Sequence, residues 1–267
     1  MGNDYIVIDP KTAPGLKLTT ENIKLICHRN FGIGSDGVLY GPLSDKGNLR
    51  LQIFNPDGSE AEKSGNGVRI FARYLLDAGY ITKTKPFTLK TLGGDVVVEF
   101  LKNSDLIKVN MGKAIFQSDK IPVKGKLREV VNESLLINKK SYQVTCVSMG
   151  NPHCVIPLEK ISAQLAHEIG PFVENHEIFP NRINMQLLQV ISRKKIQIEI
   201  WERGAGYTLA SGSSSCAAVA AAHKLGLVDP SVDVLMPGGL IHIDRTEDGS
   251  VFMTGPVTKV ATGTWEK

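Results

Sequence analysis

The sequence predicts an α+β fold of two similar domains, each with a mixed β-sheet wrapped around a central helix. Three observations lead to this prediction. Short β-branched or alternating runs, typical of strands, recur along the chain between clusters of Gly, Pro, Asn and Asp. Two segments, Val68–Ala78 and Cys216–Leu227, carry small and apolar residues at helical spacing. The order of strands, helix and strands occurs twice.

In the first half, a short helix and several strands are expected. The strands are Tyr5–Asp9, Leu49–Phe54, Phe87–Thr91, Asp95–Phe100 and Leu106–Asn110, and the short helix is Glu21–His28. In the second half, the expected strands are Tyr142–Ser148, Met185–Ile191, Lys195–Trp201 and Leu240–Asp244. Lys, Pro and Gly interrupt the strand pattern from Gly112 to Gly125. We therefore expect domains at residues 1–113 and 114–267. This division leaves open that the last strand pairs within the first domain.

The composition is that of an ordinary globular protein. Of 267 residues, 42% are hydrophobic and 22% are charged, and the net charge of +4 comes without a basic stripe, so no nucleic-acid partner is expected. No apolar run reaches the roughly 18 to 20 residues of a membrane span. With no signal segment at the amino terminus, a cytoplasmic protein is expected. Four single cysteines without CxxC spacing predict buried thiols rather than a metal site or disulfides.

Two segments that open the predicted central helices resemble each other. In each half, a strand and a polar turn lead to a Ser-Gly-rich entry: Ser64-Gly65-Asn66-Gly67 in the first and Ser211-Gly212-Ser213-Ser214 in the second. The first turn of a helix leaves backbone N–H groups unpaired at the positive end of the helix dipole, which suits an anion such as a carboxylate. Serine is also a common N-cap, so a purely structural role is the favoured interpretation of either segment taken alone, and the presence of two matching segments weakens it.

Short motifs also follow one another along nearly the whole chain. They are Gly2-Asn3-Asp4-Tyr5, His28-Arg29 with Phe31–Gly37, Asn55 with Asp57–Glu62, Gly65-Asn66-Gly67 with Arg69, Asn151-Pro152-His153, Arg182 with Asn184, Glu202–Gly206, Pro237-Gly238-Gly239 and Met253–Pro256. In this order they resemble the motifs of the diaminopimelate epimerase family, whose members are amino-acid epimerases that use no cofactor.

The resemblance implies a reaction and a place for it. Family members interconvert LL- and meso-diaminopimelate, a precursor of lysine and peptidoglycan, by two-base transfer of the α-proton. One cysteine removes the proton as a thiolate, and a second returns a proton to the opposite face. The implied ligand is a small amino acid, held in a cleft between the two domains, with no pyridoxal phosphate and no metal. A homodimer is one assembly that the resemblance allows.

The motifs also assign roles residue by residue. Ser64 and Ser211 fall at the positions of the catalytic cysteines. The expected substrate-binding residues are Asn3, Asn55, Gly65, Asn66, Asn151, Asn184, Glu202, Arg203, Gly212 and Ser213. Among these, Gly65-Asn66 and Gly212-Ser213 would present backbone N–H groups to the α-carboxylate, and Glu202 and Arg203 would engage the amino and distal groups.

The two serines are the main departure from the family pattern. A serine hydroxyl is a far weaker acid than a thiol, so activity of this chain is in doubt. Three readings fit: the cysteines were replaced by design, the chain is a related racemase, isomerase or dehydratase acting on another substrate, or it is an inactive homologue that binds an amino acid. Tight binding without exchange of the α-proton would single out the last.

Overall fold

The computed structural model describes residues 2–45 and 48–265 and divides into two compact units. The amino-terminal unit contains Asn3–Val109 and the segment from Thr254 onward, and the carboxyl-terminal unit contains Asn110–Met253 with Gly2. Compared with the expected ranges, 1–113 and 114–267, the division falls a few residues earlier, and the segment after Met253 belongs with the first half. In that segment, Trp265 packs against a cluster that includes Ile23 and Ile26.

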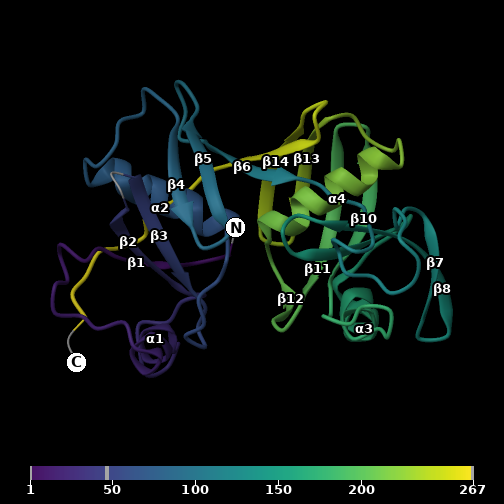
Figure 1. Ribbon diagram of the computed structural model, residues 1–267, viewed down its shortest axis with the longest axis horizontal. Helices are drawn as coiled ribbons and strands as arrows, with labels where there is room; N and C mark the ends of the chain where they lie inside the picture. Colours follow the sequence, from purple (N-terminus) through teal and green to yellow (C-terminus); the bar gives the residue numbers. More distant parts are fainter. Residues whose placement is uncertain (1, 46–47, 266–267) are drawn as a thin grey trace. The chain divides into compact units, whose positions relative to one another are not determined.

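The amino-terminal unit is a mixed sheet with the strand order β1-β2-β3-β4-β5-β6 (Figure 1). Its strands are β1 (Ile6–Ile8), β2 (Val38–Asp45), β3 (Asn48–Phe54), β4 (Phe87–Thr91), β5 (Gly94–Phe100) and β6 (Ile107–Lys113), and its helices are α1 (Thr20–Cys27) and α2 (Gly65–Asp77). The pairs β1–β2 and β3–β4 are parallel, whereas β2–β3, β4–β5 and β5–β6 are antiparallel. β6 continues past Val109 into the other unit.

Helix α2 is the core element of this unit. Its Val68, Phe71 and Leu75 are fully buried, as expected for apolar side chains three to four positions apart on one helix face. On the sheet, β5 buries Val96, Val98 and Phe100 and exposes the residues between them, which is the alternation of a strand with one covered face.

In the carboxyl-terminal unit, the strands follow the order β15-β14-β13-β11-β10-β9-β8-β7, with both parallel and antiparallel pairs. Its strands are β7 (Glu133–Ile137), β8 (Lys140–Ser148), β9 (Pro152–Pro157), β10 (Asn184–Ser192), β11 (Lys195–Glu202), β12 (Gly206–Thr208), β13 (Ser231–Met236), β14 (Gly239–Arg245) and β15 (Ser250–Gly255), and its helices are α3 (Ala163–Glu174) and α4 (Gly212–Lys224). Strand β12 pairs with β11 outside the main order.

Helix α4 is buried on all sides. Every residue from Ser214 to Ala222 is buried, and most of them are alanine. The helix contacts β8, β9, β10, β11, β13 and β14, so the sheet curls around it (Figure 1). Small side chains allow strands to approach the helix closely from several directions.

The two units share one pairing order. In the first, β1 is parallel to β2, β2 antiparallel to β3, and β3 parallel to β4. In the second, β9 is parallel to β10, β10 antiparallel to β11, and β11 parallel to β13. Helices α2 and α4 occupy the same place in this order, between β3 and β4 and between β11 and β13. The expectation of two similar α+β units is therefore confirmed.

Helices α2 and α4 begin at Gly65 and Gly212, as their Ser-Gly entries predict, and so include the residues just before the apolar patterns at Val68 and Cys216. Other elements differ from the sequence expectation for identifiable reasons. Helix α3 was not predicted, since Gly170-Pro171 is a helix-breaking signal and yet lies within it. Strand β2 was not predicted because Gly41-Pro42 interrupts it at a register shift.

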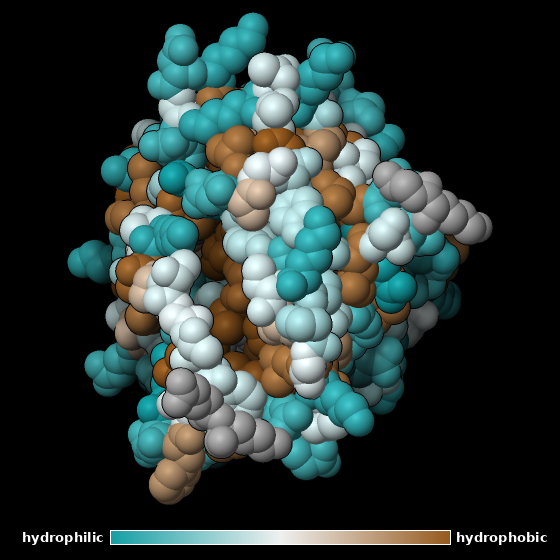
Figure 2. Space-filling view, turned by 90° about the vertical axis from the view of Figure 1, so that its left-hand side faces the viewer, coloured by the Kyte–Doolittle hydropathy of each residue, from teal (hydrophilic) through white to brown (hydrophobic). Residues whose placement is uncertain are grey.

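Figure 2 looks onto the side of the amino-terminal unit. Hydrophilic residues lie mainly around the rim of this face, and hydrophobic residues show in a hollow near its centre. Among residues 2–45 and 48–265, no helix is long and apolar enough to cross a membrane.

The burial of α2 gives a stability prediction. Replacing Phe71, which is fully buried, with Ala should lower the free energy of unfolding by about 3–5 kcal/mol, because the lost packing leaves a cavity. Phe31 is 79% exposed and serves as the matched control, so Phe31→Ala should change stability by less than about 0.5 kcal/mol. Urea unfolding measures both. Equal losses would contradict the assignment of α2 as the core helix.

Candidate active site

Ser64 caps the amino terminus of α2. Its backbone is extended (φ −136°, ψ 116°), and its Oγ accepts the Gly67 N–H at 3.1 Å. The first intrahelical bond runs from Val68 N–H to the Ser64 carbonyl at 2.8 Å. The N–H groups of Gly65 and Asn66 precede that bond and are therefore donors that the helix itself leaves unpaired. The Tyr5 hydroxyl lies 3.2 Å from Ser64 Oγ.

A chain of polar contacts holds Asn66 beside this cap. Its side-chain N–H group donates to Asn3 Oδ1 at 3.0 Å, and its Oδ1 accepts from Arg69 at 2.8 Å. Asn3 in turn donates to Asp36 at 2.6 Å. The predicted residues Asn3 and Asn66 are thus in direct contact at the start of α2, and each side-chain amide has a fixed orientation.

Asn55 is held within its own turn. Its side chain donates to Ser59 Oγ at 3.0 Å, and its backbone N–H donates to the Ser59 carbonyl at 2.9 Å. Gly58 takes a left-handed conformation (φ 85°) in this turn, which a side chain at that position would strain. Asn55 itself is half-buried and directly follows β3. Within residues 2–45 and 48–265, no hydrogen bond joins Asn55 to Ser64 or Asn66.

Ser211 repeats the cap at α4. Its backbone is extended (φ −146°, ψ 125°), and its Oγ accepts the Ser214 N–H at 3.4 Å. The Ser211 carbonyl accepts two bonds from Ser215, one from its N–H at 3.1 Å and one from its Oγ at 2.9 Å. Gly212 and Ser213 precede the first intrahelical bond, so they hold the same positions as Gly65 and Asn66.

A buried hydrogen-bond chain reaches this second cap from the sheet. Gln186 Nε2 lies 3.1 Å from His153 Nδ1 and donates to Ser214 Oγ at 3.0 Å. His153 Nε2 lies 2.9 Å from Asn151 Oδ1, and the Asn151 amide N–H donates to Ser213 Oγ at 3.3 Å. His153 therefore accepts at Nδ1 and donates from Nε2, which fixes its neutral tautomer.

Burial keeps His153 neutral. The side chain is fully buried, and desolvation lowers its pKa to about 3; the positive charge of Arg203 lowers the pKa further, while the Gln186 hydrogen bond opposes the shift. A packed, neutral histidine in this place orients Asn151 and is poorly suited to carry a proton near neutral pH.

Asn184 and Arg203 are in contact where β10 begins and β11 ends. The Asn184 side chain donates to the Pro152 carbonyl at 2.7 Å and accepts the Arg203 backbone N–H at 2.9 Å. The Arg203 guanidinium donates to the Asn181 carbonyl at 3.0 Å. Glu202, the last residue of β11, precedes Arg203 in a tight turn closed by the Ala205 N–H and the Glu202 carbonyl.

Eight of the predicted residues form two groups, one in each unit, whereas Asn55, Asn184, Glu202 and Arg203 are held by other contacts. Asn3, Asn66 and Ser64 with Gly65 gather at the start of α2, and Asn151 and Ser213 gather with Ser211 and Gly212 at the start of α4. Sequence reasoning gave no role to Tyr5 or Gln186. For Gln186 a signal existed: it is a fully buried amide between Met185 and Leu187, in an otherwise apolar stretch of strand.

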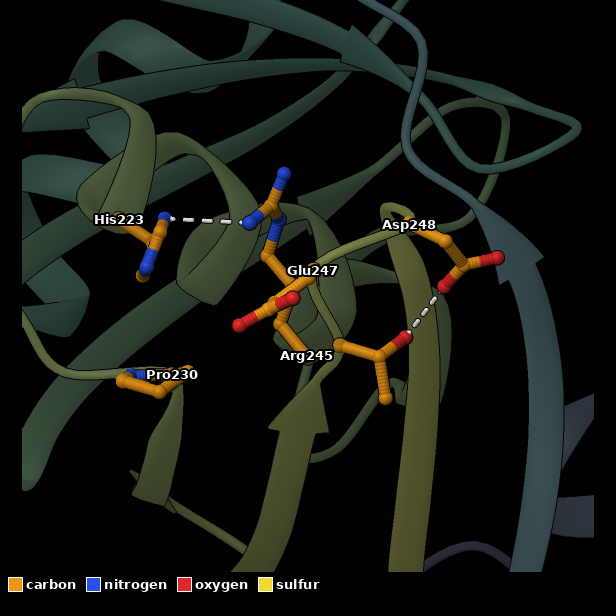
Figure 3. Close-up of a pocket in the computed structure, with 6 residues that line it drawn as sticks. His223, Pro230, Arg245, Glu247 and Asp248 are labelled. Atoms are coloured by element: carbon orange, nitrogen blue, oxygen red, sulfur yellow. Dashed lines mark hydrogen bonds between the residues drawn. The ribbon is translucent and has the colours of Figure 1, made fainter.

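A separate hollow of about 590 Å³ lies at the other end of α4 (Figure 3). It is lined by His223, Pro230, Arg245, Thr246, Glu247 and Asp248, none of which is a predicted site residue. Helix α4 has 13 residues, so this hollow is roughly 20 Å from Ser211. Within the described chain, no group of three or more His, Cys, Asp and Glu side chains is placed to hold a metal ion.

Each cap has groups that are suited to bind a carboxylate. Two unpaired backbone N–H groups, the positive end of a helix dipole and a serine hydroxyl converge at the start of each helix. A side chain placed at the cap also lies where an N-terminal helix dipole favours its anionic form, which is the environment that lowers the pKa of a cysteine thiol.

The caps give a first prediction for this site. Ser64→Ala and Ser211→Ala should each lower the free energy of unfolding by about 0.5–2 kcal/mol, because each removes an acceptor from a helix start. The control is Ser162→Ala, since Ser162 caps α3 through the Leu165 N–H at 3.1 Å. Urea unfolding should give similar losses for all three. A loss at Ser162 with none at Ser64 and Ser211 would contradict the cap geometry.

His153 gives a second prediction, a dependence of stability on pH. Its pKa is about 3 when folded and near 6.5 when unfolded, so between these values only the unfolded chain binds the proton. The free energy of unfolding should therefore fall as the pH drops below about 6.5, by up to about 1.4 kcal/mol per pH unit.

Urea unfolding between pH 7.5 and 5 measures this slope. His153→Gln should flatten it, and Phe31→Ala, at an exposed side chain that carries no titratable group, should leave it unchanged. An unchanged slope in His153→Gln would show that His153 is not the buried neutral group.

Comparisons with known proteins agree with the motif order. The family model described as diaminopimelate epimerase matches residues 1–117 and 145–260. Diaminopimelate epimerase 2 of Nostoc sp. is 53% identical over 264 residues, which cover 98% of this chain and 92% of that protein. The diaminopimelate epimerase of Synechococcus elongatus is 40% identical over 271 residues, which cover 100% of this chain and 95% of that protein.

A solved structure shows the same fold at much lower identity. The PhzF-family phenazine biosynthesis protein of Bacillus anthracis has a TM-score of 0.63 at 16% identity, covering 96% of this chain and 91% of that chain. At that identity the likeness concerns the fold alone. The family model and the relatives, by contrast, match this chain over most of its length. The chain therefore belongs to the diaminopimelate epimerase family.

Proposed function

We propose that this chain is a diaminopimelate epimerase by fold and by substrate contacts, and that its two serines limit catalysis. The observation that carries the proposal is that Ser64 and Ser211 are the N-caps of the central helices α2 and α4. The two helices occupy equivalent positions in two units with the same order of strand pairing. Both are the positions that the family motifs give to catalytic cysteines. Relatives named diaminopimelate epimerase, 40% and 53% identical to this chain, support the substrate.

The proposed chemistry needs two groups acting on one α-carbon. One group takes the α-proton, the electron pair stays on the α-carbon and spreads into the α-carboxylate, and a second group returns a proton to the opposite face. Backbone N–H groups at a helix start would stabilise that developing negative charge. No cofactor is required for these steps.

The residues around the caps would hold the substrate for this transfer. Gly65-Asn66 and Gly212-Ser213 would offer backbone N–H groups to the α-carboxylate, and Asn3, Asn55, Asn151 and Asn184 would bind its polar groups. Glu202 and Arg203 would engage its amino and distal groups. The fixed amide orientations of Asn66 and Asn151 support this assignment, because an oriented amide binds without further ordering.

The serines favour a second candidate function, binding without turnover. A serine hydroxyl keeps the cap but is a poor base, and loss of one acid–base group commonly costs about 10²–10⁴ in rate. Oxygen is slightly smaller than sulfur and makes the same caps, so the binding geometry would survive the replacement. The chain would then hold a diaminopimelate-like amino acid without exchanging its α-proton.

We further propose that the chain works in the cytoplasm on a free amino acid, and that a homodimer is its assembly. The cytoplasm is where a bacterial precursor of lysine and peptidoglycan would be made. Sedimentation of the purified chain tests the assembly, and a monomer at all concentrations would contradict it.

The function is tested by α-proton exchange. LL-diaminopimelate is incubated in D₂O with the serine chain, with Ser64→Cys, with Ser211→Cys and with the double variant. The double variant should incorporate deuterium and invert the centre at least about 10²-fold faster than the serine chain. Each single variant should fall well below the double variant, because each has only one thiol.

The outcomes separate the candidates. Turnover by the serine chain would show that a hydroxyl can act as the base here. Binding of LL-diaminopimelate by the serine chain, with exchange restored only by the cysteines, supports an epimerase scaffold that binds without turnover. No binding and no exchange in any form would contradict the substrate.

A further inference from the structure

Helix α3 presents one face to the turn that carries Glu202 and Arg203. Its His167, Gly170 and Glu174 are three and four positions apart and so share a side of the helix. The His167 ring stacks on Tyr207 with centroids 4.7 Å apart and meets Trp201 edge-on at 5.8 Å. Trp201 and Tyr207 lie on the two strands, β11 and β12, that flank the turn.

Glycine at position 170 allows this close packing. A Cβ built there would lie 2.5 Å from the Trp201 indole, which is closer than atoms can approach without displacement. The indole therefore rests directly on the backbone of α3. This contact fixes the distance between α3 and the end of β11.

The Glu174 carboxylate forms the polar part of the same interface. Although it is a carboxylate, the residue is only 6% exposed. Its Oε2 accepts the Trp201 indole N–H at 2.8 Å, and its Oε1 accepts the Gly204 backbone N–H at 2.9 Å. Oε1 also pairs with the Arg182 guanidinium at 2.9 Å. Three donors thus converge on one buried side chain: two come from the β11–β12 hairpin, and one comes from the segment just before β10.

Each of these donors adjoins a proposed substrate-binding residue. Gly204 follows Arg203 in the turn, and Trp201 precedes Glu202. Arg182, with a left-handed backbone (φ 56°), lies two residues before Asn184, whose side chain holds the Arg203 N–H. Glu174 therefore holds the turn through the Gly204 N–H group, and Asn184 holds it through the Arg203 N–H group.

The corresponding turn in the amino-terminal unit has no such anchor among its recorded contacts. The turn at Asn55–Ser59 is closed by its own groups, with Ser59 bonded to Asp57 at 2.6 Å and to Asn55 at 3.0 Å. The carboxyl-terminal turn instead depends on a side chain that lies some 30 residues earlier in the chain.

We propose that Glu174 is a positioning residue that holds the Glu202-Arg203 turn in its binding conformation and so sets the affinity for the substrate. The proposal rests on the proposed function, because it takes Glu202 and Arg203 as substrate contacts. Glu174 itself is buried behind the turn and acts through it. Its loss should weaken binding of ground state and transition state alike, since it orders the turn rather than the reacting atoms.

The test uses Glu174→Gln, which keeps the shape but puts an N–H group where the carboxylate accepts from Trp201 or Gly204. The matched control is Glu168→Gln, at an exposed position of the same helix. Calorimetry with LL-diaminopimelate on the serine chain should show a dissociation constant about tenfold higher for Glu174→Gln and unchanged for Glu168→Gln, because hydrogen bonds to charged groups are the strong ones.

A kinetic readout separates positioning from general loss of structure. In the Ser64→Cys, Ser211→Cys background, Glu174→Gln should raise KM about tenfold and change kcat by less than about threefold. Glu174→Asp, which keeps the carboxylate, should recover part of the affinity. If Glu174→Gln fails to fold, Trp201→Phe removes one of the three donors and keeps most of the ring, and it should still raise the dissociation constant about threefold.

The outcomes distinguish the two proposals. If the parent chain binds LL-diaminopimelate and folded Glu174→Gln binds it equally well, the positioning role is wrong while the proposed function stands; equal binding by Trp201→Phe has the same meaning. If kcat falls and KM stays, Glu174 acts on the chemistry and the proposal is overturned. If the parent does not bind the substrate at all, the proposed function fails, and this inference with it.

Discussion

A helix that is buried from its first turn must find partners for backbone N–H groups that its own hydrogen bonds leave unpaired. Helices α2 and α4 both face this constraint, since each is buried from its first residue. A serine hydroxyl satisfies one donor at each start. The helix itself does not pair the backbone N–H groups of the first two helical residues. Glycine at the first helical position lets a ligand approach these groups closely. The proposed binding of a carboxylate at the two caps would therefore follow from how the helices are buried.

The two units solve this constraint with the same backbone and different side chains. Strand pairing and helix placement repeat, but the polar groups behind each cap do not. In the amino-terminal unit, Asn66 is oriented through Asn3 and the acidic Asp36. In the carboxyl-terminal unit, Ser213 is oriented through Asn151, a neutral His153 and Gln186. The first cap thus has a charged group behind it, whereas the second has a buried neutral chain, so the two caps are chemically distinct.

Much of the fold could be predicted from local sequence patterns, and the reasons for the failures are equally local. Strands with clear alternation and the alanine-rich central helix were predicted because their signals lie within a few residues. Helix α3 was missed because Gly170 and Pro171 indicate a break, although glycine is needed there for contact with Trp201. That reason is tertiary, since Trp201 lies 31 positions away in the chain.

The candidate site shows the same division. Motif resemblance led to Ser64 and Ser211, and the structure places both as helix caps, while their catalytic role stays a prediction. The resemblance could not show that His153 is a neutral link in a buried chain, because that depends on burial and on Gln186 in a neighbouring strand. Glu174 could not be singled out for a similar reason: helix α3 was not predicted, and two of the three donors to Glu174 lie 27 and 30 positions later in the chain.

The near-uniform side chains of α4 have a further consequence for how that helix is oriented. Around most of its circumference it presents alanine, so turning it about its axis would exchange one methyl group for another at little cost in packing. Apolar fit therefore defines its rotation only weakly. Apart from the buried Cys216 and Val219, the features that distinguish one rotation from the next are polar contacts in its first turn, where Ser214 contacts Gln186 and Ser215 contacts Met236. The polar contacts behind the second cap thus also help to define the rotation of α4 about its own axis. The orientation of Ser211 therefore depends on the same contacts that orient the proposed binding groups.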